Sequence, residues 1–204
     1  MRRTENLRRR RATRTPKQRF LIICEGRVTE PRYFNQIRHL MRSPIDLEVL
    51  PGGDPKLLVE LAVQRKRESD LNASRNNDSY LAYDQIWCVC DVDQHERLRD
   101  ALQQAKANLI QVALSNPCFE LWALLHFQDQ TAHIERAQAR HLCKKYMPGY
   151  DKELPCSTLM QFLPDAVKRA TELAAMHQRQ NTHRANPSTE VYLLIAEIES
   201  QRQS

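Results

Sequence analysis

The sequence predicts an α/β fold with about four mainly parallel strands, flanked by helices, and a helical C-terminal half. In the first half, apolar runs rich in β-branched and aromatic residues alternate with helical patterns. The helical patterns between these runs are ten or more residues long, as crossovers between parallel strands require. From Asn116 onward the pattern is helical, so the sheet is expected to lie in the first half.

Four segments are expected to form the strands. The first, "RFLIIC", is apolar without interruption, which is typical of a strand covered on both faces. The second, "IDLEVL", alternates, and the third contains "DQIWCVCDVD". The expected strands therefore cover residues 19–24, 45–50, 84–93 and 109–114.

Helices are expected between these strands and throughout the C-terminal half. Asp54 is a good N-cap and Pro55 suits the first helical position after it. Thr29 is a candidate cap for a helix over 30–41, whereas the polar, turn-rich segment 67–79 predicts a loop. The other helices are expected at 97–107, 117–127, 134–146, 157–180 and 189–199.

The positive charge of the chain is concentrated at its N-terminus. The chain has a net charge of +6, but residues 1–19 hold eight Arg, one Lys and one Glu, a net charge of +8 that leaves −2 for the rest. So few apolar residues predict a disordered basic arm over 1–18, followed by an α/β core over 19–115 and a helical part over 116–200 that completes the same domain. The arm either binds phosphate backbones without sequence selectivity or is a solvated tail; its central arginines are Arg8, Arg9, Arg10 and Arg11.

The composition favours a cytoplasmic protein without membrane association. No apolar run approaches the roughly 20 residues that span a bilayer, and the basic N-terminus is not followed by an apolar stretch of signal-peptide length. The six cysteines form no C-x-x-C pair, so we expect buried, reduced thiols and neither disulfides nor a zinc site.

Carboxylates follow two of the predicted strands. Glu25 comes directly after the first strand, and Asp91 and Asp93 come at the end of the third. The i, i+2 spacing points both aspartates to one side of an extended chain, and functional groups in parallel sheets gather at the carboxyl ends of the strands. If the two strands are neighbours, three carboxylates converge, which predicts a site for Mg²⁺ or Mn²⁺.

The segment "SNPCFELWALLHF" predicts a buried helix with an acidic residue near its start. Asn116 is a candidate N-cap, Pro117 suits the first position, and apolar residues surround the helix on nearly all sides. Glu120 would therefore be buried, where a carboxylate is costly unless it is paired or bound to a metal. It is either a helix-edge residue paired with an arginine or a fourth acidic residue of the site.

Two further residues are candidates for contacts with a phosphate group. His95 follows Asp93 by two positions and could donate a proton or touch a phosphate; otherwise it is a solvated loop residue. Arg184 precedes a second Asn-Pro segment, where a helix start with free N–H groups could bind a phosphate. Ser188 and Thr189 would alternatively serve there as helix caps alone.

Four motifs in order resemble the RloB family of Toprim-like proteins, which occur beside restriction-modification genes and in phage-defence loci. They are "ICEGRVTEPRYF", "CDVDQH", "SNPCFELWALLHF" and "NPST", and the resemblance covers about residues 19–196. It implies a Toprim-like fold, the domain shared by topoisomerases, primases and overcoming-lysogenization-defect nucleases.

The resemblance also implies roles for individual residues. Glu25 matches the Toprim glutamate, the proposed general acid/base, and Asp91 and Asp93 match the metal-binding D-x-D motif. Gly26 matches the glycine that lets backbone or phosphate approach closely. Three more residues lie in motifs particular to RloB: Glu30, Asn116 and Glu120.

The expected function is that of an enzyme, a Mg²⁺-dependent Toprim-like nuclease that hydrolyses DNA or RNA in prokaryotic antiviral defence. The resemblance implies a partner ATPase encoded nearby, and the chain has no G-x-x-x-x-G-K-[ST] loop of its own. One alternative is a non-catalytic nucleic-acid-binding or regulatory subunit that keeps the fold. The other is a primase-like nucleotidyl transferase that uses the same carboxylates.

Overall fold

The computed structural model describes residues 18–42, 45–49, 54–92, 97–147, 150 and 155–200, and within them it forms one five-stranded sheet. The strand order is β2-β1-β3-β4-β5; the first four strands are parallel and β5 is antiparallel to β4. The predicted α/β class and the mainly parallel sheet are therefore confirmed. The strands are β1 Phe20–Cys24, β2 Ile45–Val49, β3 Gln85–Asp91, β4 Gln111–Asn116 and β5 Ser188–Thr189.

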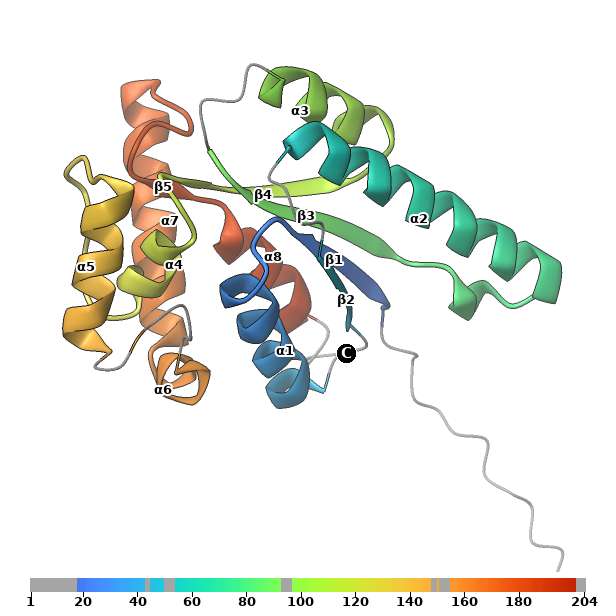
Figure 1. Cartoon of the computed structure of the whole chain (residues 1–204), viewed down its shortest axis with the longest axis horizontal. Helices are drawn as coiled ribbons and strands as arrows, with labels where there is room; N and C mark the ends of the chain where they lie inside the picture. Colours follow the sequence, from blue (N-terminus) through green and yellow to red (C-terminus); the bar gives the residue numbers. More distant parts are fainter. Residues whose placement is uncertain are drawn as a thin grey trace, which may run out of the picture.

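Helices cover both faces of this sheet (Figure 1). The helices α2 and α3 lie on one face, and α1, α4 and α8 lie on the other, with α5, α6 and α7 packed beyond them. A 3₁₀ turn, Ser79–Leu81, precedes β3. The helices are α1 Thr29–Met41, α2 Pro55–Asn76, α3 Leu98–Ala107, α4 Glu120–Leu125, α5 Arg136–Tyr146, α6 Cys156–Gln161, α7 Leu163–Gln180 and α8 Val191–Ser200.

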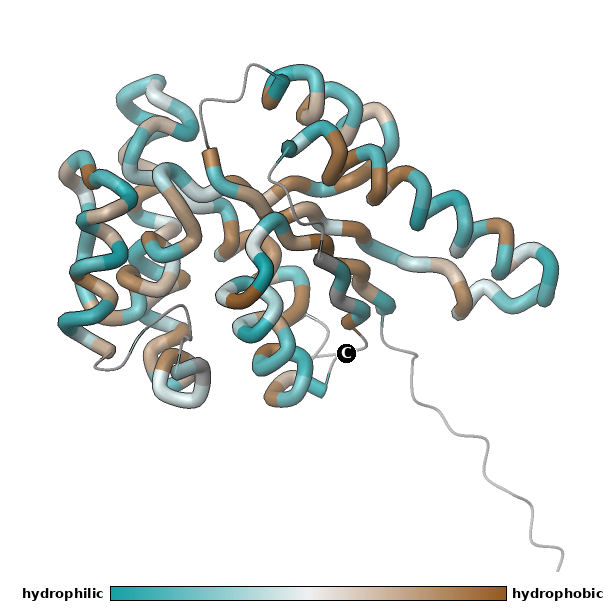
Figure 2. Tube along the Cα trace, in the orientation of Figure 1, coloured by the Kyte–Doolittle hydropathy of each residue, from teal (hydrophilic) through white to brown (hydrophobic). Residues whose placement is uncertain are grey.

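The interior strand β1, which lies between β2 and β3, is buried on both faces, as its apolar run predicts. Phe20, Ile22 and Cys24 join the core beneath α1 and the C-terminal helices, whereas Leu21 and Ile23 join the core beneath α2 and α3. Figure 2 shows the strands as the hydrophobic centre between helices with mixed surfaces. At the carboxyl edge of the sheet this apolar character ends: Glu25 follows β1, and Asp91 is the last residue of β3.

Several predicted boundaries are wrong, each for a local reason. The segment predicted as a loop at 67–79 mostly continues α2, because it lacks Gly and Pro and places Ser69 and Ala73 on the buried side of the helix. Thr29 lies inside α1, whose N-cap is Val28 without a side-chain hydrogen bond. The predicted Asp54 cap is confirmed, since its carboxylate accepts a hydrogen bond from the Lys56 backbone N–H at 2.9 Å.

The C-terminal half differs from the prediction in two places. Residues 188–189 form β5, which pairs with the end of β4, so the predicted helix begins later, at Val191. The predicted helix over 157–180 is two helices, α6 and α7, separated at Phe162. The sheet therefore gains an antiparallel edge strand from a part of the chain that was expected to be wholly helical.

The described cysteine side chains are buried and free of disulfides, as expected for reduced core thiols; they are Cys24, Cys88, Cys90, Cys118 and Cys143. Burial raises the pKa of Cys88 to about 12, which keeps this thiol unreactive. In the part of the chain that the structure describes, no helix has the length and apolar character needed to cross a bilayer.

Candidate active site at the carboxyl edge of the sheet

Glu25 and Asp91 meet because β1 and β3 are adjacent parallel strands. Cys24 lies opposite Val89 in the register, and the Glu25 backbone N–H continues the ladder to the Val89 carbonyl at 3.0 Å. The backbone N–H of Asp91 donates to Oε2 of Glu25 at 3.2 Å. The condition on which the predicted site depended, that the first and third strands are neighbours, is therefore met.

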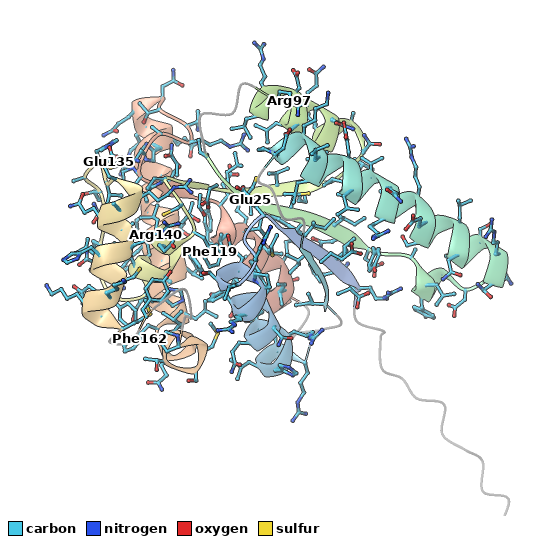
Figure 3. The ribbon with its side chains drawn as sticks, in the orientation of Figure 1. Glu25, Arg97, Phe119, Glu135, Arg140 and Phe162 are labelled. Carbon is cyan, nitrogen blue, oxygen red and sulfur yellow. The ribbon has the colours of Figure 1, made fainter. Side chains whose placement is uncertain are left out.

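A pocket of about 260 Å³ opens at this edge. The loop after β1, the first turn of α1, the end of β3 and the helices α4 and α5 all contribute to its wall. Figure 3 shows Glu25, Phe119 and Arg140, which belong to this wall. Its charged residues are the carboxylates Glu25, Glu30, Asp91 and Glu120 and the arginines Arg27, Arg136 and Arg140.

Asp91 is held at both carboxylate oxygens. Oδ1 accepts a hydrogen bond from the backbone N–H of Phe119 at 2.9 Å, and Oδ2 lies 3.4 Å from a guanidinium nitrogen of Arg136. The side chain is 13% exposed. Burial, followed by repulsion from Glu30, raises its pKa to about 8, and Arg136 offsets only part of this.

Glu30 is the second carboxyl group with a strongly shifted pKa. It lies in the first turn of α1 and is buried. Burial, with repulsion from Glu120 and Glu25, raises its pKa to about 7. Near neutral pH this carboxyl group therefore exchanges a proton readily.

Gly26 makes room for the Glu30 side chain. A Cβ atom at this position would overlap the Glu30 carboxylate. The family resemblance explained this glycine by the close approach of backbone or phosphate. In the structure the group that approaches it is the carboxylate of Glu30.

Glu120 is both paired with an arginine and part of the acidic pocket, the two alternatives that the sequence left open. Its side chain is 8% exposed and lines the pocket, and its Oε1 accepts hydrogen bonds from Arg140 Nε at 3.0 Å and from the Tyr150 hydroxyl at 3.1 Å. Burial by itself raises the pKa of Glu120, but hydrogen bonds, among them those from Cys118 and Arg140, leave it below its usual value. Glu120 is therefore an ionised, paired carboxylate within the pocket.

The donor set suits a hard divalent cation. Among the residues that the structure describes, no three His, Cys, Asp or Glu side chains form a group that could hold a metal ion. Mg²⁺, however, commonly binds through one or two carboxylates and completes its octahedron with water and substrate phosphates. Glu25 and Asp91 therefore fit such an ion in kind and in number, and Asp93 lies outside the described residues.

A family model described as RloB-like protein matches residues 20–198. The chain belongs to the RloB-like family. The match confirms the resemblance seen in the sequence, and it includes every residue that lines the pocket. Comparisons with curated proteins and with solved structures gave no match.

Two sequence candidates lie away from the pocket of this RloB-like chain. Asn116 ends β4 and does not cap α4, whose N-cap is Phe119; its amide donates to the Arg184 carbonyl at 2.9 Å. Arg184 is exposed and its Nε donates to Glu190 at 2.7 Å, beside a separate hollow between α7 and α8. The other candidates, His95 and Arg8 to Arg11, lie outside the described residues.

The arginines of the site were missed by the sequence reasoning. Arg136 and Arg140 are four residues apart on α5 and so share one helical face. This spacing was visible within the predicted helix 134–146, but nothing in the sequence says that α5 packs beside the ends of β1 and β3. The C-terminal half thus supplies the positive charges of the pocket.

Proposed function

We propose that this RloB-like protein is a Mg²⁺- or Mn²⁺-dependent nuclease that hydrolyses phosphodiester bonds in DNA or RNA. The observation that carries the proposal is the meeting of Glu25 and Asp91 at the ends of adjacent parallel strands, joined by a hydrogen bond inside one pocket. Carboxylates after the two central strands of the order β2-β1-β3-β4 also support a Toprim-like assignment of the sheet.

Asp91, Glu25 and Asp93 would hold the cation. Once bound, the ion would polarise the phosphodiester and stabilise the negative charge that develops on it. The 2.9 Å hydrogen bond from Phe119 orients Asp91, so that its Oδ2 is presented to the pocket. The hydrogen bond from the Asp91 N–H orients Glu25 in the same way.

Glu30 is the residue best suited to move a proton. A general acid or base works best when its pKa lies near the working pH, and the pKa of Glu30 is raised to about 7. Its carboxyl group lines the same pocket as Glu25 and Asp91. We therefore assign to Glu30 the proton transfer that the family resemblance assigns to Glu25.

The biological setting of the proposal rests on the family resemblance. Toprim-like nucleases of defence loci work beside ATP-binding proteins, so we propose a role in prokaryotic antiviral defence with a partner ATPase. Nucleic acid is the proposed substrate.

The test is a cleavage assay. Labelled single- and double-stranded DNA and bulk tRNA are incubated with the full chain and Mg²⁺ or Mn²⁺, comparing the wild type with Asp91→Asn and Glu25→Gln. We expect the wild type to cleave at least one substrate and each variant to lose about a hundredfold or more, since the ion supplies several kcal/mol of transition-state stabilisation. Glu172→Gln, an exposed carboxylate on α7, is the control.

Two other results would contradict the nuclease proposal and favour a different function. Metal-independent binding without cleavage, unchanged in Asp91→Asn and unchanged after addition of a candidate ATPase and ATP, would favour a non-catalytic binding subunit. Elongation of a chain that needs nucleoside triphosphates would favour nucleotidyl transfer.

A further inference from the structure

Three arginines line the acidic pocket, and the two on α5 are engaged with carboxylates. Arg140 donates from Nε to Glu120 at 3.0 Å, and Nη1 of Arg136 lies 3.4 Å from Oδ2 of Asp91. Arg136 also donates from Nη2 to the Pro117 carbonyl at 3.1 Å. The positive charges of these two residues are therefore already used within the protein.

Arg27, the third arginine, differs from them in its surroundings. It lines the same pocket but is exposed, whereas Glu25, Gly26 and Val28 beside it are partly buried. Throughout the part of the chain that the structure describes, no hydrogen bond or ion pair holds its side chain. A ligand can therefore bind this guanidinium without first breaking a contact within the described chain.

The backbone around Arg27 is fixed on both sides although the side chain is exposed. On one side, the Glu25 N–H donates to the Val89 carbonyl at 3.0 Å and continues the ladder between β1 and β3. On the other side α1 begins, and the Arg32 N–H donates to the Val28 carbonyl at 3.1 Å. This short connection therefore keeps the guanidinium beside the carboxyl edge of the sheet, two residues from Glu25.

A nucleic acid that enters this pocket meets four acidic side chains, whose negative charge repels its phosphates. A bound cation would neutralise part of this charge at Asp91 and Glu25, the proposed metal ligands. Arg27 offers donors in a planar fork, which matches two oxygens of a phosphate. Because Arg27 is exposed whereas the Asp91 side chain is only 13% exposed, its guanidinium suits a phosphate farther from the cation than the one that is cleaved.

We propose that Arg27 binds a phosphate group next to the cleaved phosphodiester of the nucleic acid. The inference rests on the proposed function and names a substrate contact within it. Because this neighbouring phosphate does not react, it carries the same charge in the ground state and in the transition state. Arg27 therefore stabilises both states equally, which lowers KM and leaves kcat unchanged.

Replacement of Arg27 should therefore separate KM from kcat. Arg27→Gln removes the phosphate contact and should raise KM for the cleaved DNA or RNA by about tenfold, with kcat changed by less than about twofold. Arg27→Lys keeps the charge but not the planar fork, so it should raise KM by only about threefold.

The experiment measures kcat and KM of the full chain with Mg²⁺ on a short labelled oligonucleotide, DNA or RNA, that the wild type cleaves. After the main cleavage position is mapped, the phosphate on each side of it is replaced in turn by an uncharged methylphosphonate. With the wild type, one of these replacements should raise KM by about tenfold. With Arg27→Gln, the same replacement should raise KM little further, because the partner of that phosphate is already gone.

Arg75→Gln is the matched control for the loss of a positive charge. Arg75 is an exposed arginine in the last turn of α2, and the C-terminal end of α2 lies on the opposite side of the molecule from α5 (Figure 1). This variant should therefore keep the wild-type KM and the wild-type response to each methylphosphonate. Thermal unfolding verifies that every variant is folded, and Arg27→Lys decides if Arg27→Gln does not fold.

The outcomes separate this inference from the proposed function. A higher KM at unchanged kcat, together with loss of the methylphosphonate effect in Arg27→Gln, supports the inference. If each methylphosphonate raises KM equally in the wild type and in Arg27→Gln, Arg27 does not bind these phosphates; loss of cleavage in Asp91→Asn would still support the metal site. A fall in kcat alone would place Arg27 at the cleaved phosphodiester and overturn the inference. Absence of cleavage by the wild type, with Mg²⁺ or Mn²⁺ and with a candidate ATPase and ATP, overturns both.

Discussion

At the scale of single residues, the pocket gathers like charges at a cost to stability. Burial raises the pKa of both Asp91 and Glu30; repulsion from Glu30 raises that of Asp91 further, and repulsion from Glu120 and Glu25 raises that of Glu30. The arginines of α5 offset only part of this repulsion. Binding of a cation would relieve it, which is the physical reason to expect one here.

The raised pKa values predict that neutral variants are more stable than the wild type. The folded-state pKa values, about 7 for Glu30 and about 8 for Asp91, lie above their usual values of 4.5 and 3.8. The folded protein thus holds these protons more tightly, and its stability falls as pH rises from about 4 to about 8. At pH 8 without metal, Glu30→Gln and Asp91→Asn should each raise the free energy of unfolding by on the order of 2 kcal/mol.

Urea denaturation in EDTA at pH 5 and pH 8 measures this effect. The advantage of the variants should shrink at pH 5, where the wild-type carboxyl groups are largely protonated, and Glu172→Gln should show none. The two gains should not add fully, because the groups are coupled. Variants that are less stable than the wild type at pH 8 would show that the ionised carboxylates do not destabilise the folded protein.

Gly26 and Glu30 are predicted to act as one unit. An alanine at position 26 would push the Glu30 carboxylate out of its place. We expect Gly26→Ala to lower kcat/KM for cleavage toward the value of Glu30→Ala, about a hundredfold below the wild type. In a Glu30→Ala background, Gly26→Ala should lower kcat/KM only slightly further. An equal fold-loss of kcat/KM in both backgrounds would refute the coupling.

At the scale of elements, the C-terminal end of α3 places a residue other than glycine in a left-handed backbone conformation. Ile110 N–H donates to the Ala105 carbonyl at 2.9 Å and Leu109 N–H donates to the Lys106 carbonyl at 3.3 Å, the two bonds of a Schellman motif. Leu109 has a φ of 58° and is 80% exposed. A glycine suits such a left-handed position, and here a leucine occupies it.

Leu109→Gly should therefore stabilise the protein, by about 1 kcal/mol. The substitution relieves the left-handed backbone and removes little packing, because the side chain is exposed. Chemical denaturation measures the change, and Leu109→Ala separates loss of the side chain from relief of the backbone. If glycine destabilises more than alanine does, the exposed leucine has a role that the backbone argument omits.

The strand ends could be predicted from the sequence, whereas several helix boundaries could not. Glu25 and Asp91 each follow a run of apolar residues buried on both faces, so their place at the sheet edge is a local property. The helix α2 extends to Asn76 through a polar segment supported by the ion pairs Arg65–Glu68 and Lys66–Asp70. Because such a segment is rich in charged surface residues, it lacks the regular spacing of apolar residues from which a helix is predicted.

At the scale of the whole molecule, the pocket is assembled from both halves of the chain. The N-terminal half supplies Glu25, Glu30 and Asp91, and the C-terminal half supplies Glu120 and the α5 arginines. One core cluster contains residues from β1, α1 and the helices α4 to α8. The carboxylates at the strand ends could be predicted from the sequence, because the pattern of a strand is local. The presence of the α5 arginines in the pocket could not, because it depends on how helices distant in the sequence pack.

The charge distribution predicts a salt-sensitive role for the N-terminal segment. Residues 1–17 carry seven Arg, one Lys and one Glu, a net charge of +7. Arg19, by contrast, is fixed by contacts with Asp46 at 2.9 Å and the Leu81 carbonyl at 2.7 Å, so a deletion can end before Gln18. Removing 1–17 should weaken nucleic-acid binding and flatten its dependence on salt concentration.

Binding titrations of both proteins between about 50 and 200 mM salt measure this slope. Cleavage per bound substrate should remain, because the pocket lies outside the deleted segment. An unchanged slope would identify the segment as a passive tail.

The most direct test of the metal site is a crystal of the full chain soaked in Mn²⁺, with anomalous diffraction measured for the wild type and Asp91→Asn. We expect a peak at the pocket, about 2.0–2.3 Å from carboxylate oxygens of Asp91 and Glu25, which the variant loses. A peak elsewhere, or none in the wild type at millimolar Mn²⁺, would contradict the assignment of these carboxylates as the metal site.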